Sequence, residues 1–557
     1  MIRAKLRPHF DKLLLAVIFV VLSTSTILWT IKDKTPPAWD PSDHMRYAYD
    51  YYRLLAHADF AGFAREFFVT THFYAPLVHI VSAAVFLVVG ATRLTGVFVN
   101  LISLVALIWS VGSASRTLYA RSAPATDQMT AEPSVALSVL PALIVACYHF
   151  SAWLMHDAFL DFPLAAAVSA AFALLIRAGD FKARRSAIAF GVAAGIGMLV
   201  KQTFAFFFVL PALLVLFRVL KTRDRRAITN LVLAGLVLVL VAAIWYGPHL
   251  QDVIAIYREN QRAALSENEA PLFTFDSNFF YIHALLSMQM QLPLAVLFAL
   301  GVAYSLVRCR KESLILYLWL LSGLAAFALV ANKDVRYTVP ILPAAAILST
   351  CWLRDFKANA ARKTVALKVA LVAIIAGWSL VSFYNSQWPR PGFGTAIDTP
   401  RYRWMVFARN YYGFDHRPLD DDWSVPEIVR TVSAFDAGYS SNVTQSASAP
   451  VLGVVVNLPY LNPSNVALYS RLLTSQRAAS PLIDVRWVVE PSMLDRIAEC
   501  DYLLVRTGLN KADWVAPVER EVERLMKDHS LQFSRAASFP IPLKDAEAIV
   551  YKYERTN

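Results

Sequence analysis

The chain has few charged residues and few cysteines for its length. Of its 557 residues 17% are charged and 57% are hydrophobic, whereas soluble proteins carry about 25% charged residues. A soluble globular protein is therefore excluded. Three of the four cysteines lie in or beside apolar segments (Cys147, Cys309 and Cys351), which leaves Cys500 alone in the polar C-terminal part. A disulfide framework is impossible there.

The chain also has no contiguous basic segment of the kind that binds nucleic acid. Its net charge is +12, yet the Lys and Arg residues fall in short clusters between apolar runs. Clusters of this kind are topology signals of a membrane protein rather than a nucleic-acid surface. We therefore expect membrane lipids, and no nucleic acid, among its partners.

Apolar runs predict a polytopic α-helical membrane protein. A span needs about 20 mostly apolar residues, and about eleven stretches qualify. They lie near 13–31, 94–112, 133–150, 162–177, 187–200, 203–219, 229–246, 292–307, 313–331, 337–353 and 364–384. The stretch 76–90 is shorter, begins at Pro76 and contains His79, so we expect it to lie at the membrane interface, with a full span as the alternative.

Charge in the connecting segments orients these spans. With a cytoplasmic N-terminus, the inner connections contain 22 Lys and Arg residues and the short outer ones contain 3. This distribution agrees with the positive-inside rule, and it would be inverted if 76–90 were a span. The first 31 residues have no small-residue cleavage pattern and are interpreted as the first helix. An odd number of spans then places residue 385 onward outside.

The chain therefore divides into two predicted parts. Residues 1–384 form a transmembrane module, with outside loops at 32–93 and 247–291 whose aromatic residues favour interfacial helices. Residues 385–557 form a soluble, periplasmic or exoplasmic α/β domain. Its predicted strands are 451–456, 485–489 and 502–505, its predicted helices are 466–473 and 518–526, and 531–539 with 546–553 form a closing hairpin.

Ionisable residues gather on the predicted outer face, where each is a functional candidate. Acids and histidines come early in the chain, at Asp40, Asp43, His44, Glu66, His156, Asp157 and Asp161. Bases and aromatic hydroxyls dominate later, at Lys201, Arg258, His283, Arg336 and Tyr337, with Tyr47 in the first loop. Carboxylates can act as general base and orient hydroxyls, whereas Lys and Arg can hold a phosphate. A transferase that uses a lipid-phosphate-linked sugar needs both.

Several short motifs follow one another in a family-like order. Asp43-His44-Met45-Arg46-Tyr47 matches D-E-x-x-Y except that His44 replaces the second acid, and Tyr74-Ala75-Pro76-Leu77 echoes a Tyr-Pro-Pro-Leu element. Further along, Asp161-Phe162-Pro163-Leu164 matches R-x-x-x-x-D-x-P-L, with His156 in place of Arg. The last elements are G-x-x-x-K, matched by Gly197 and Lys201, and R-Y-x-x-P-x-x-P, matched by Arg336, Tyr337, Pro340 and Pro343.

With these motifs the chain resembles the protein O-mannosyltransferase and aminoarabinose transferase group, polytopic glycosyltransferases of the GT-C superfamily similar to glycosyltransferase family 39. The resemblance covers roughly residues 10–355. It implies an inverting glycosyltransferase that takes a sugar from a polyprenyl-phosphate donor and moves it to a lipid, glycan or protein acceptor. Asp43, rather than Asp40, would be the base, and Lys201 with Arg336 would hold the phosphate.

Each candidate also has an ordinary structural interpretation. Asp43 can cap a helix, Asp40 before Pro41 suits a turn, and Asp161 suits a helix N-terminus. Lys201 can extend its charge to the membrane surface. Glu66 is a candidate for the second acid that His44 does not supply. A carboxylate and histidine set can hold a divalent metal ion, although no i, i+4 ligand pair supports one, so metal use is left open.

Three other functions fit parts of the pattern. A transporter or flippase of lipid-linked sugars typically has paired halves with broken helices, and no internal repeat is visible here. A glycan polymerase or ligase would use a pyrophosphate-linked donor and would need more outer arginines. An inactive relative is compatible with His44 and His156. The localisation expected for the transferase is the bacterial inner membrane, with the N-terminus cytoplasmic and the C-terminal domain periplasmic.

Overall fold

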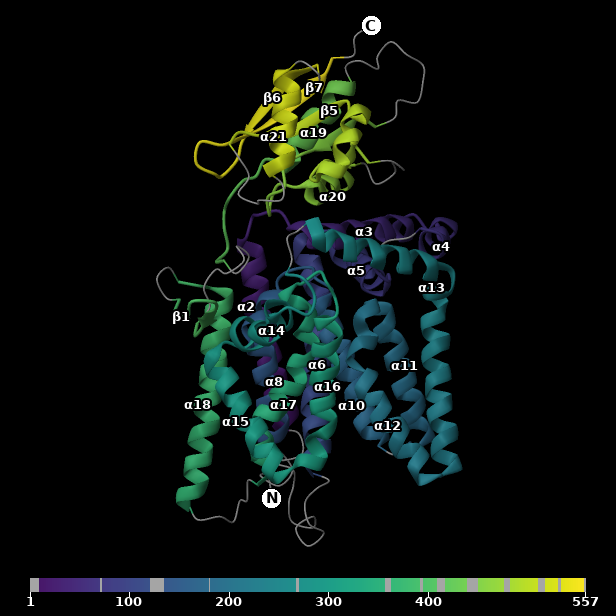
Figure 1. Ribbon diagram of the computed structural model, residues 1–557, viewed down its shortest axis with the longest axis vertical. Helices are drawn as coiled ribbons and strands as arrows, with labels where there is room; N and C mark the ends of the chain where they lie inside the picture. The colour runs from purple at the N-terminus through teal and green to yellow at the C-terminus, as the bar shows by residue number, and fades with distance from the viewer. Residues whose placement is uncertain are drawn as a thin grey trace.

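Long apolar helices run side by side through one end of the computed structural model, and a sheet with its own helices forms the other end (Figure 1). Short helices lie between these two tiers. The structure describes residues 10–70, 73–120, 135–179, 181–266, 270–355, 362–390, 394–407, 416–437, 449–474, 481–508, 516–528 and 532–554.

Six helices in the described ranges are long and apolar enough to cross a membrane. Each coincides with a predicted span, because an uninterrupted apolar run satisfies all its backbone hydrogen bonds as a helix. They are α2 (Phe10–Lys32), α6 (Arg93–Ala120), α10 (Asp161–Ala178), α13 (Arg225–Ser266), α16 (Arg310–Ala328) and α18 (Arg362–Gln387).

The other five predicted spans are shorter helices or broken ones. Their segments are α8 (Val135–Cys147) with α9 (His149–Leu154), α11 (Arg184–Val200), η2 (Gln202–Phe207) with α12 (Val209–Thr222), α15 (Leu292–Arg308), and η4 (Val335–Ile341) with α17 (Leu342–Ser349) and η5 (Cys351–Asp355). A bend of 116° separates α15 from the preceding pair α14 (Phe275–His283) and η3 (Ala284–Gln289). The total of eleven spans therefore stays a prediction.

Proline explains part of this irregularity. Pro141 lies inside α8 and Pro340 inside η4, and proline removes a backbone N–H and clashes with the preceding turn. Irregular backbone at membrane depth is tolerated where protein rather than lipid surrounds it. Every residue of α17 is buried, so this short helix lies within the bundle.

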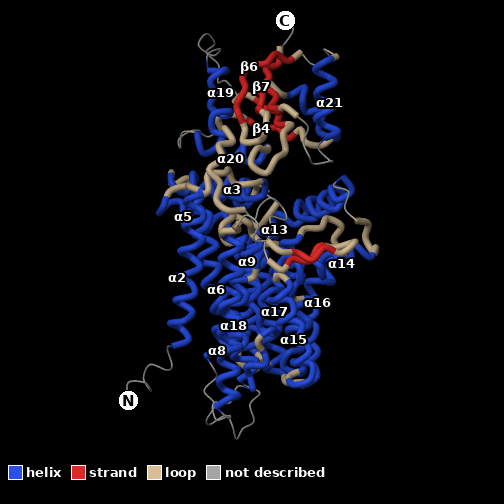
Figure 2. Tube along the Cα trace, turned by 90° about the vertical axis from the view of Figure 1, so that its left-hand side faces the viewer, coloured by secondary structure: helices blue, strands red, loops and turns tan. Residues whose placement is uncertain are grey.

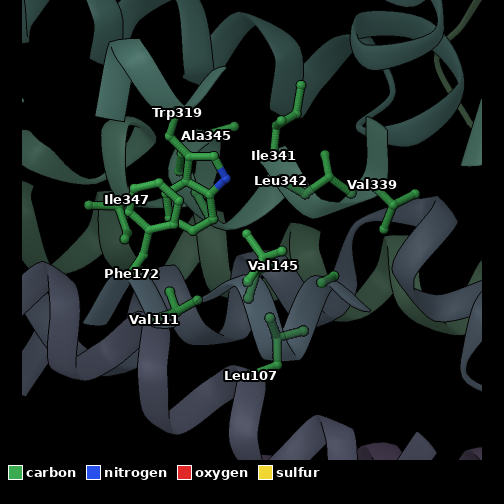
Figure 3. Packing of buried hydrophobic residues seen from close by; sticks show 14 of the residues in the cluster. Leu107, Val111, Val145, Phe172, Trp319, Val339, Ile341, Leu342, Ala345 and Ile347 are labelled. Carbon is green, nitrogen blue, oxygen red and sulfur yellow. The ribbon is translucent and has the colours of Figure 1, made fainter. Parts of the chain in front are cut away.

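Aromatic and small residues build the core of the bundle. The rings of Phe172 (α10) and Trp319 (α16) stack with centroids 3.8 Å apart (Figure 3). Between α11 and α13, a methyl group added at Gly191 would lie 2.5 Å from the carbonyl oxygen of Ala234. Glycine thus lets two helix backbones approach closely, as small residues do between helices in membranes.

A layer of short helices covers one end of the bundle, which we call the α3 end. It contains α3 (Trp39–Ala56), α4 (Phe60–Phe68) and α5 (Leu77–Val89). With 13 residues, α5 is about 20 Å long and too short to span by itself, and the interfacial position of 76–90 stays a prediction. Helix α13 continues past Pro248 into the predicted outside loop, and His249 there contacts the carbonyl oxygen of Phe67 at 3.0 Å.

Residues 416–554, the C-terminal region, contain a five-stranded sheet in the order β4-β3-β5-β7-β6. Strand β3 pairs in parallel with β4 and β5, and β7 pairs antiparallel with β5 and β6. These five strands lie within one or two residues of the segments that the sequence analysis predicted as strands and as the closing hairpin. The elements are α19 (Val425–Ala437), β3 (Val451–Val454), α20 (Pro463–Leu473), β4 (Asp484–Trp487), η7 (Pro491–Glu499), β5 (Tyr502–Arg506), α21 (Ala516–Lys527), β6 (Phe533–Pro540) and β7 (Glu547–Tyr553).

A small hairpin precedes this sheet. Strands β1 (Ala396–Asp398) and β2 (Arg403–Met405) lie beside α14, apart from the other strands (Figure 2). The hydroxyl of Ser287 in η3 donates to the carbonyl oxygen of Arg403 at 3.0 Å and accepts from the amide of Met405 at 2.9 Å. The boundary predicted at residue 385 thus precedes a hairpin that packs on the bundle.

Candidate active site

Helix α3 presents four of the candidate residues on one face. Asp40, Asp43, His44 and Tyr47 are spaced by three or four positions, and residues at this spacing are neighbours on a helix surface. Ala38 in extended conformation precedes the helix. Local helical periodicity alone therefore brings these side chains to the same side of the α3 end.

Lys201 and Asp161 form a buried ion pair below α3. The ammonium nitrogen of Lys201 lies 2.7 Å from Oδ1 of Asp161, and their side chains are 7% and 2% exposed. The rings of Tyr74 and Tyr337 lie 5.5 and 5.4 Å from the same nitrogen. Charged groups are buried in this way only when they are paired, because removing a charge from water costs free energy. Packing of the bundle does not require a buried ion pair at this position.

A glycine allows the chain to place Lys201 here. Lys201 caps α11 in an extended conformation, and η2 folds back directly after it. A methyl group at Gly197 would lie 2.1 Å from the ring of Phe204 in η2. The glycine of the G-x-x-x-K element thus makes room for the turn that aims the lysine at Asp161.

Arg336 connects helix α3 to the segment that precedes η4. Its Nη2 lies 2.7 Å from Oδ2 of Asp40, and its Nε lies 2.7 Å from Oδ2 of Asp334. Asp334 also caps η4 by accepting from the backbone amide of Arg336 at 3.0 Å. The guanidinium group lies over the ring of Phe159 at 4.4 Å. Asp40, the less favoured acid in the sequence, therefore contacts one of the predicted phosphate-binding cations.

Asp43 faces a different set of partners. Its Oδ1 accepts from Arg46 at 3.0 Å, and its Oδ2 accepts from the hydroxyl of Ser464 in α20 at 2.7 Å. Burial raises the pKa of Asp43 above its usual value, while Arg46 and Ser464 act in the opposite direction. A raised pKa brings a carboxylate closer to the range in which a general base works well at neutral pH.

His44 pairs with His79 of α5. Nδ1 of His44 lies 3.1 Å from Nε2 of His79, and both side chains are buried. Burial lowers the pKa of His44 well below its usual value, and the nearby charges of Lys201 and Arg336 lower it further. His44 is therefore neutral at physiological pH and does not replace the negative charge of the family's second acid.

The histidine and the acid before α10 both lie near Arg93. His156 stacks on Trp29 with ring centroids 3.7 Å apart, and its Nδ1 lies 3.5 Å from Oε1 of Gln387. Burial raises the pKa of Asp157 to about 6, and Arg93 acts in the opposite direction. His156 thus joins α2 to the end of α18 and is not brought to the Lys201–Asp161 pair.

Three candidates lie in other surroundings. Arg258 is exposed on α13. His283 contacts the carbonyl oxygen of Arg403 in the small hairpin at 2.9 Å. Glu66 on α4 lies beside Tyr51, which is two turns, or about 12 Å, beyond Asp43 along α3. The structure therefore associates His283 with the hairpin and Glu66 with the far half of α3.

The structure adds contacts that motif reading missed. Phe159 and Asp334 hold Arg336, His79 pairs with His44, and Ser464 reaches Asp43 from 421 positions away. Asp334 stood in the same loop as Arg336, so its proximity was a usable signal. Nothing in the sequence connects Ser464 to the first loop. Within the described ranges no group of three or more His, Cys, Asp or Glu side chains is placed to hold a metal ion.

Comparisons with known proteins agree with this fold. The family model of the Alg9-like mannosyltransferase family matches residues 63–391. ArnT from Cupriavidus metallidurans, solved with bound undecaprenyl phosphate, is similar at 15% identity and a TM-score of 0.52, over 96% of this chain and 97% of that one. Its apo structure is similar at 14% identity and a TM-score of 0.51, with the same coverage.

A third solved structure is larger than this chain. The arabinofuranosyltransferase AftD from Mycobacteria is similar at 13% identity and a TM-score of 0.50, over 97% of this chain and 40% of that one. At these identities the likeness shows the fold. No curated protein matches the chain. The family model and the shared fold together confirm the GT-C resemblance that the motifs carried.

Proposed function

The chain belongs to the Alg9-like mannosyltransferase family, and from that premise we propose that it moves a sugar, with inversion, from a polyprenyl-phosphate donor to an acceptor hydroxyl. It is an integral membrane glycosyltransferase with several apolar helices. We propose that the reaction takes place on the outer face of a bacterial inner membrane, and the 22-to-3 distribution of Lys and Arg supports an outer position for the α3 end.

The observation that carries the proposal is the set of two cation–carboxylate pairs at the α3 end, of which Lys201–Asp161 is buried and Arg336–Asp40 is partly exposed. Lys201 and Arg336 lie on separate elements, and each is held by a carboxylate within 2.7 Å. A guanidinium and an ammonium group together suit a phosphate, which gains negative charge when it leaves the sugar. The carboxylates keep both cations in place, and the donor phosphate would bind beside them.

The chemistry follows from the positions of the acids. The acceptor oxygen attacks the anomeric carbon, and the bond from that carbon to the phosphate oxygen breaks with its electron pair on the phosphate. The acceptor proton passes to Asp43, the residue in the motif position of the base. Asp161, beside Lys201, would orient a hydroxyl of the donor sugar. A direct displacement of this kind inverts the anomeric centre.

The donor class draws support from ArnT, whose structure contains undecaprenyl phosphate. The two folds coincide over nearly the whole of both chains, so a polyprenyl phosphate is the donor carrier that we propose here. Family membership makes mannose the first sugar to test. The acceptor class in this proposal is a lipid, glycan or protein that carries a hydroxyl.

A transfer assay tests the proposal. The purified chain in lipid nanodiscs is incubated with labelled polyprenyl-phosphate sugars, starting with mannose, and with a mixture of lipid, glycan and protein acceptors, and release of the polyprenyl phosphate is measured. Asp43→Asn should lower release by about 10³-fold, because the amide cannot take the proton. The matched control is Asp59→Asn, because Asp59 caps α4 in the same loop and Asn caps as well as Asp.

Two outcomes would contradict parts of this proposal. Full turnover by Asp43→Asn would show that Asp43 is not the base. Asp40→Asn would then test whether Asp40, the acid that contacts Arg336, is the base instead. If the wild-type chain released polyprenyl phosphate from none of the labelled donors, the proposed donor class would be wrong.

A further inference from the structure

A cavity of about 510 Å³ lies between α11 and α13. The two helices pack on each other, and α13 runs from the end of the bundle opposite α3 up to the layer of short helices (Figure 1). The cavity is lined by four cations and two neutral polar side chains, which are Lys182, Arg184, Arg225, Arg226, Thr229 and Asn230. Among the residues that the structure describes, no acid belongs to this lining, so the cavity suits an anion.

Buried hydrogen bonds hold the wall of this cavity in place. Nδ2 of Asn230 in α13 donates to the carbonyl oxygens of Phe181 and Lys182, at 2.8 and 3.3 Å, and Asn230 is 4% exposed. These bonds fix the segment that precedes α11 to the first turns of α13. The cations therefore stand on a wall whose shape the fold determines.

Two acids near this end of the bundle are engaged elsewhere. Asp224, directly before α13, accepts from the backbone amides of Arg226 and Ala227 at 2.9 and 3.4 Å, and so caps that helix. In a second cavity, between α2, α6 and α10, Asp11 lies 2.8 Å from the guanidinium group of Arg116. There the chain supplies its own counter-ion. The described lining of the cavity between α11 and α13 supplies none, so its cations attract an anion from outside the chain.

Exposed apolar side chains continue from the cavity along the same helices. Val232 and Leu236 follow Thr229 by three and seven positions, which places all three on one face of α13, and they are 65% and 53% exposed. On α11, Val192 and Ile196 are exposed as well. In a membrane such side chains contact the acyl chains of lipids. A ligand in this cavity therefore meets cations at one end and an apolar surface beyond them.

We propose that this cavity binds the phosphate headgroup of an anionic phospholipid, whose acyl chains lie along the apolar face of α13. Basic pockets between membrane helices on the cytoplasmic side bind such headgroups, and this end is the cytoplasmic one in the orientation proposed above. Four cations suit two phosphates, so cardiolipin, which carries two, should bind more tightly than phosphatidylglycerol, which carries one. A soluble anion would use the cations and leave the apolar face unused.

A lipid titration tests the proposal. Thermal unfolding of the purified chain in detergent is followed while cardiolipin, phosphatidylglycerol or phosphatidylcholine is added. A ligand that binds only the folded chain raises Tm with its concentration, so the rise in Tm gives an apparent Kd. We expect the tightest binding for cardiolipin and none for phosphatidylcholine, which has no net charge. An equal rise with phosphatidylcholine would overturn the proposal, because the charge of the headgroup would then not matter.

A matched pair of variants separates the cavity from the general charge of this end. Arg184→Gln/Arg226→Gln removes two lining cations and should raise the Kd for cardiolipin about 25-fold, or about fivefold for each cation near the headgroup. Arg310→Gln/Lys363→Gln removes two exposed cations at the same end but outside this cavity, and should leave the Kd unchanged. Equal weakening by both pairs would overturn the proposal, since the attraction would then be diffuse. An unchanged Kd in Arg184→Gln/Arg226→Gln would overturn it too.

Inorganic phosphate tests the other source of the same chemistry. It is added to the wild-type chain at the concentration at which cardiolipin saturates the rise in Tm, and we expect no rise, because it has no acyl chains. A rise equal to that with cardiolipin would refute the lipid and identify a soluble anion as the occupant. Sugar transfer plays no part in these measurements. A chain that transfers no sugar would therefore refute the proposed function and leave the lipid result unchanged.

Discussion

The two ends of the helical bundle carry the same kinds of cation in opposite environments. At the α3 end, Lys201 and Arg336 are buried or nearly so, and carboxylates hold them. At the other end, Lys182, Arg184 and Arg226 are exposed around an open cavity between α11 and α13. Around these two sites, residues of the same type are buried and paired in one place and exposed in the other, and we propose that the pairs at the α3 end serve the reaction.

The physical reason is the cost of desolvation. An exposed lysine or arginine keeps its water and needs no partner, and its interactions are weakened by salt. A buried one loses that water, so the fold must supply an acid and aromatic rings, as it does around Lys201. Variants at the two ends should therefore have very different effects.

The largest effect is expected from Lys201→Met. It leaves Asp161 buried without its cation, which should destabilise the chain by about 3–5 kcal/mol and abolish transfer. The double variant Lys201→Met/Asp161→Leu should recover most of the stability and none of the activity. Thermal unfolding in detergent and the transfer assay measure both. If Lys201→Met were as stable as the wild type, the buried cation would contribute no more to stability than an exposed one at the opposite end.

Arg336→Lys should have the next largest effect. An ammonium group cannot hold Asp40 and Asp334 at once as the guanidinium fork does. We expect kcat/KM for the donor to fall on the order of 10²-fold, comparable to the loss of one transition-state donor. Steady-state kinetics with varied donor check this. A wild-type rate in Arg336→Lys would mean that a positive charge is enough for donor binding and that the two-sided contact of the guanidinium group is not needed.

The pH profile should reveal the burial of Asp43. Burial raises the pKa of Asp43, and the base must be deprotonated to act, so transfer should fall as the pH drops through this raised value. Arg46→Met removes a charge that lowers the pKa and should move the acid limb of kcat to higher pH. Arg53→Met at the other end of α3 is the matched control. A limb that moves to lower pH in Arg46→Met would refute the assignment.

The same shift has a consequence for stability. A carboxyl whose folded-state pKa is raised binds its proton more tightly in the folded chain than in the unfolded one. The contribution of Asp43 is therefore most favourable at low pH and decreases as the pH rises through the raised pKa. Unfolding measured against pH in wild type and Asp43→Asn isolates this contribution.

The smallest effect is expected at the opposite end. Arg226→Gln removes an exposed charge, so the free energy of unfolding should change by less than about 0.5 kcal/mol and transfer should stay at the wild-type rate. The same assays used for Lys201→Met measure it. A loss of transfer comparable to that of Lys201→Met would show that exposed cations at this end also serve the reaction.

Motif order predicted the GT-C superfamily, and it predicted some site contacts better than others. Lys201 and Asp161 were both chosen from the sequence, and the structure brings them together. Asp43 was preferred to Asp40, yet Asp40 is the acid that contacts Arg336. His156 stood in a motif position and stacks on Trp29 instead. A motif specifies residue types in order, but it does not specify the direction in which each side chain points.

The sequence by itself determined the six long apolar helices, the strands of the C-terminal region and the charge asymmetry between connections, because each of these depends on residues near one another in the chain. Only the tertiary structure decided which acid meets which cation and that α20 covers Asp43. These contacts join residues from 40 to more than 400 positions apart. They depend on how helices pack and where prolines break them, and no local pattern encodes that packing.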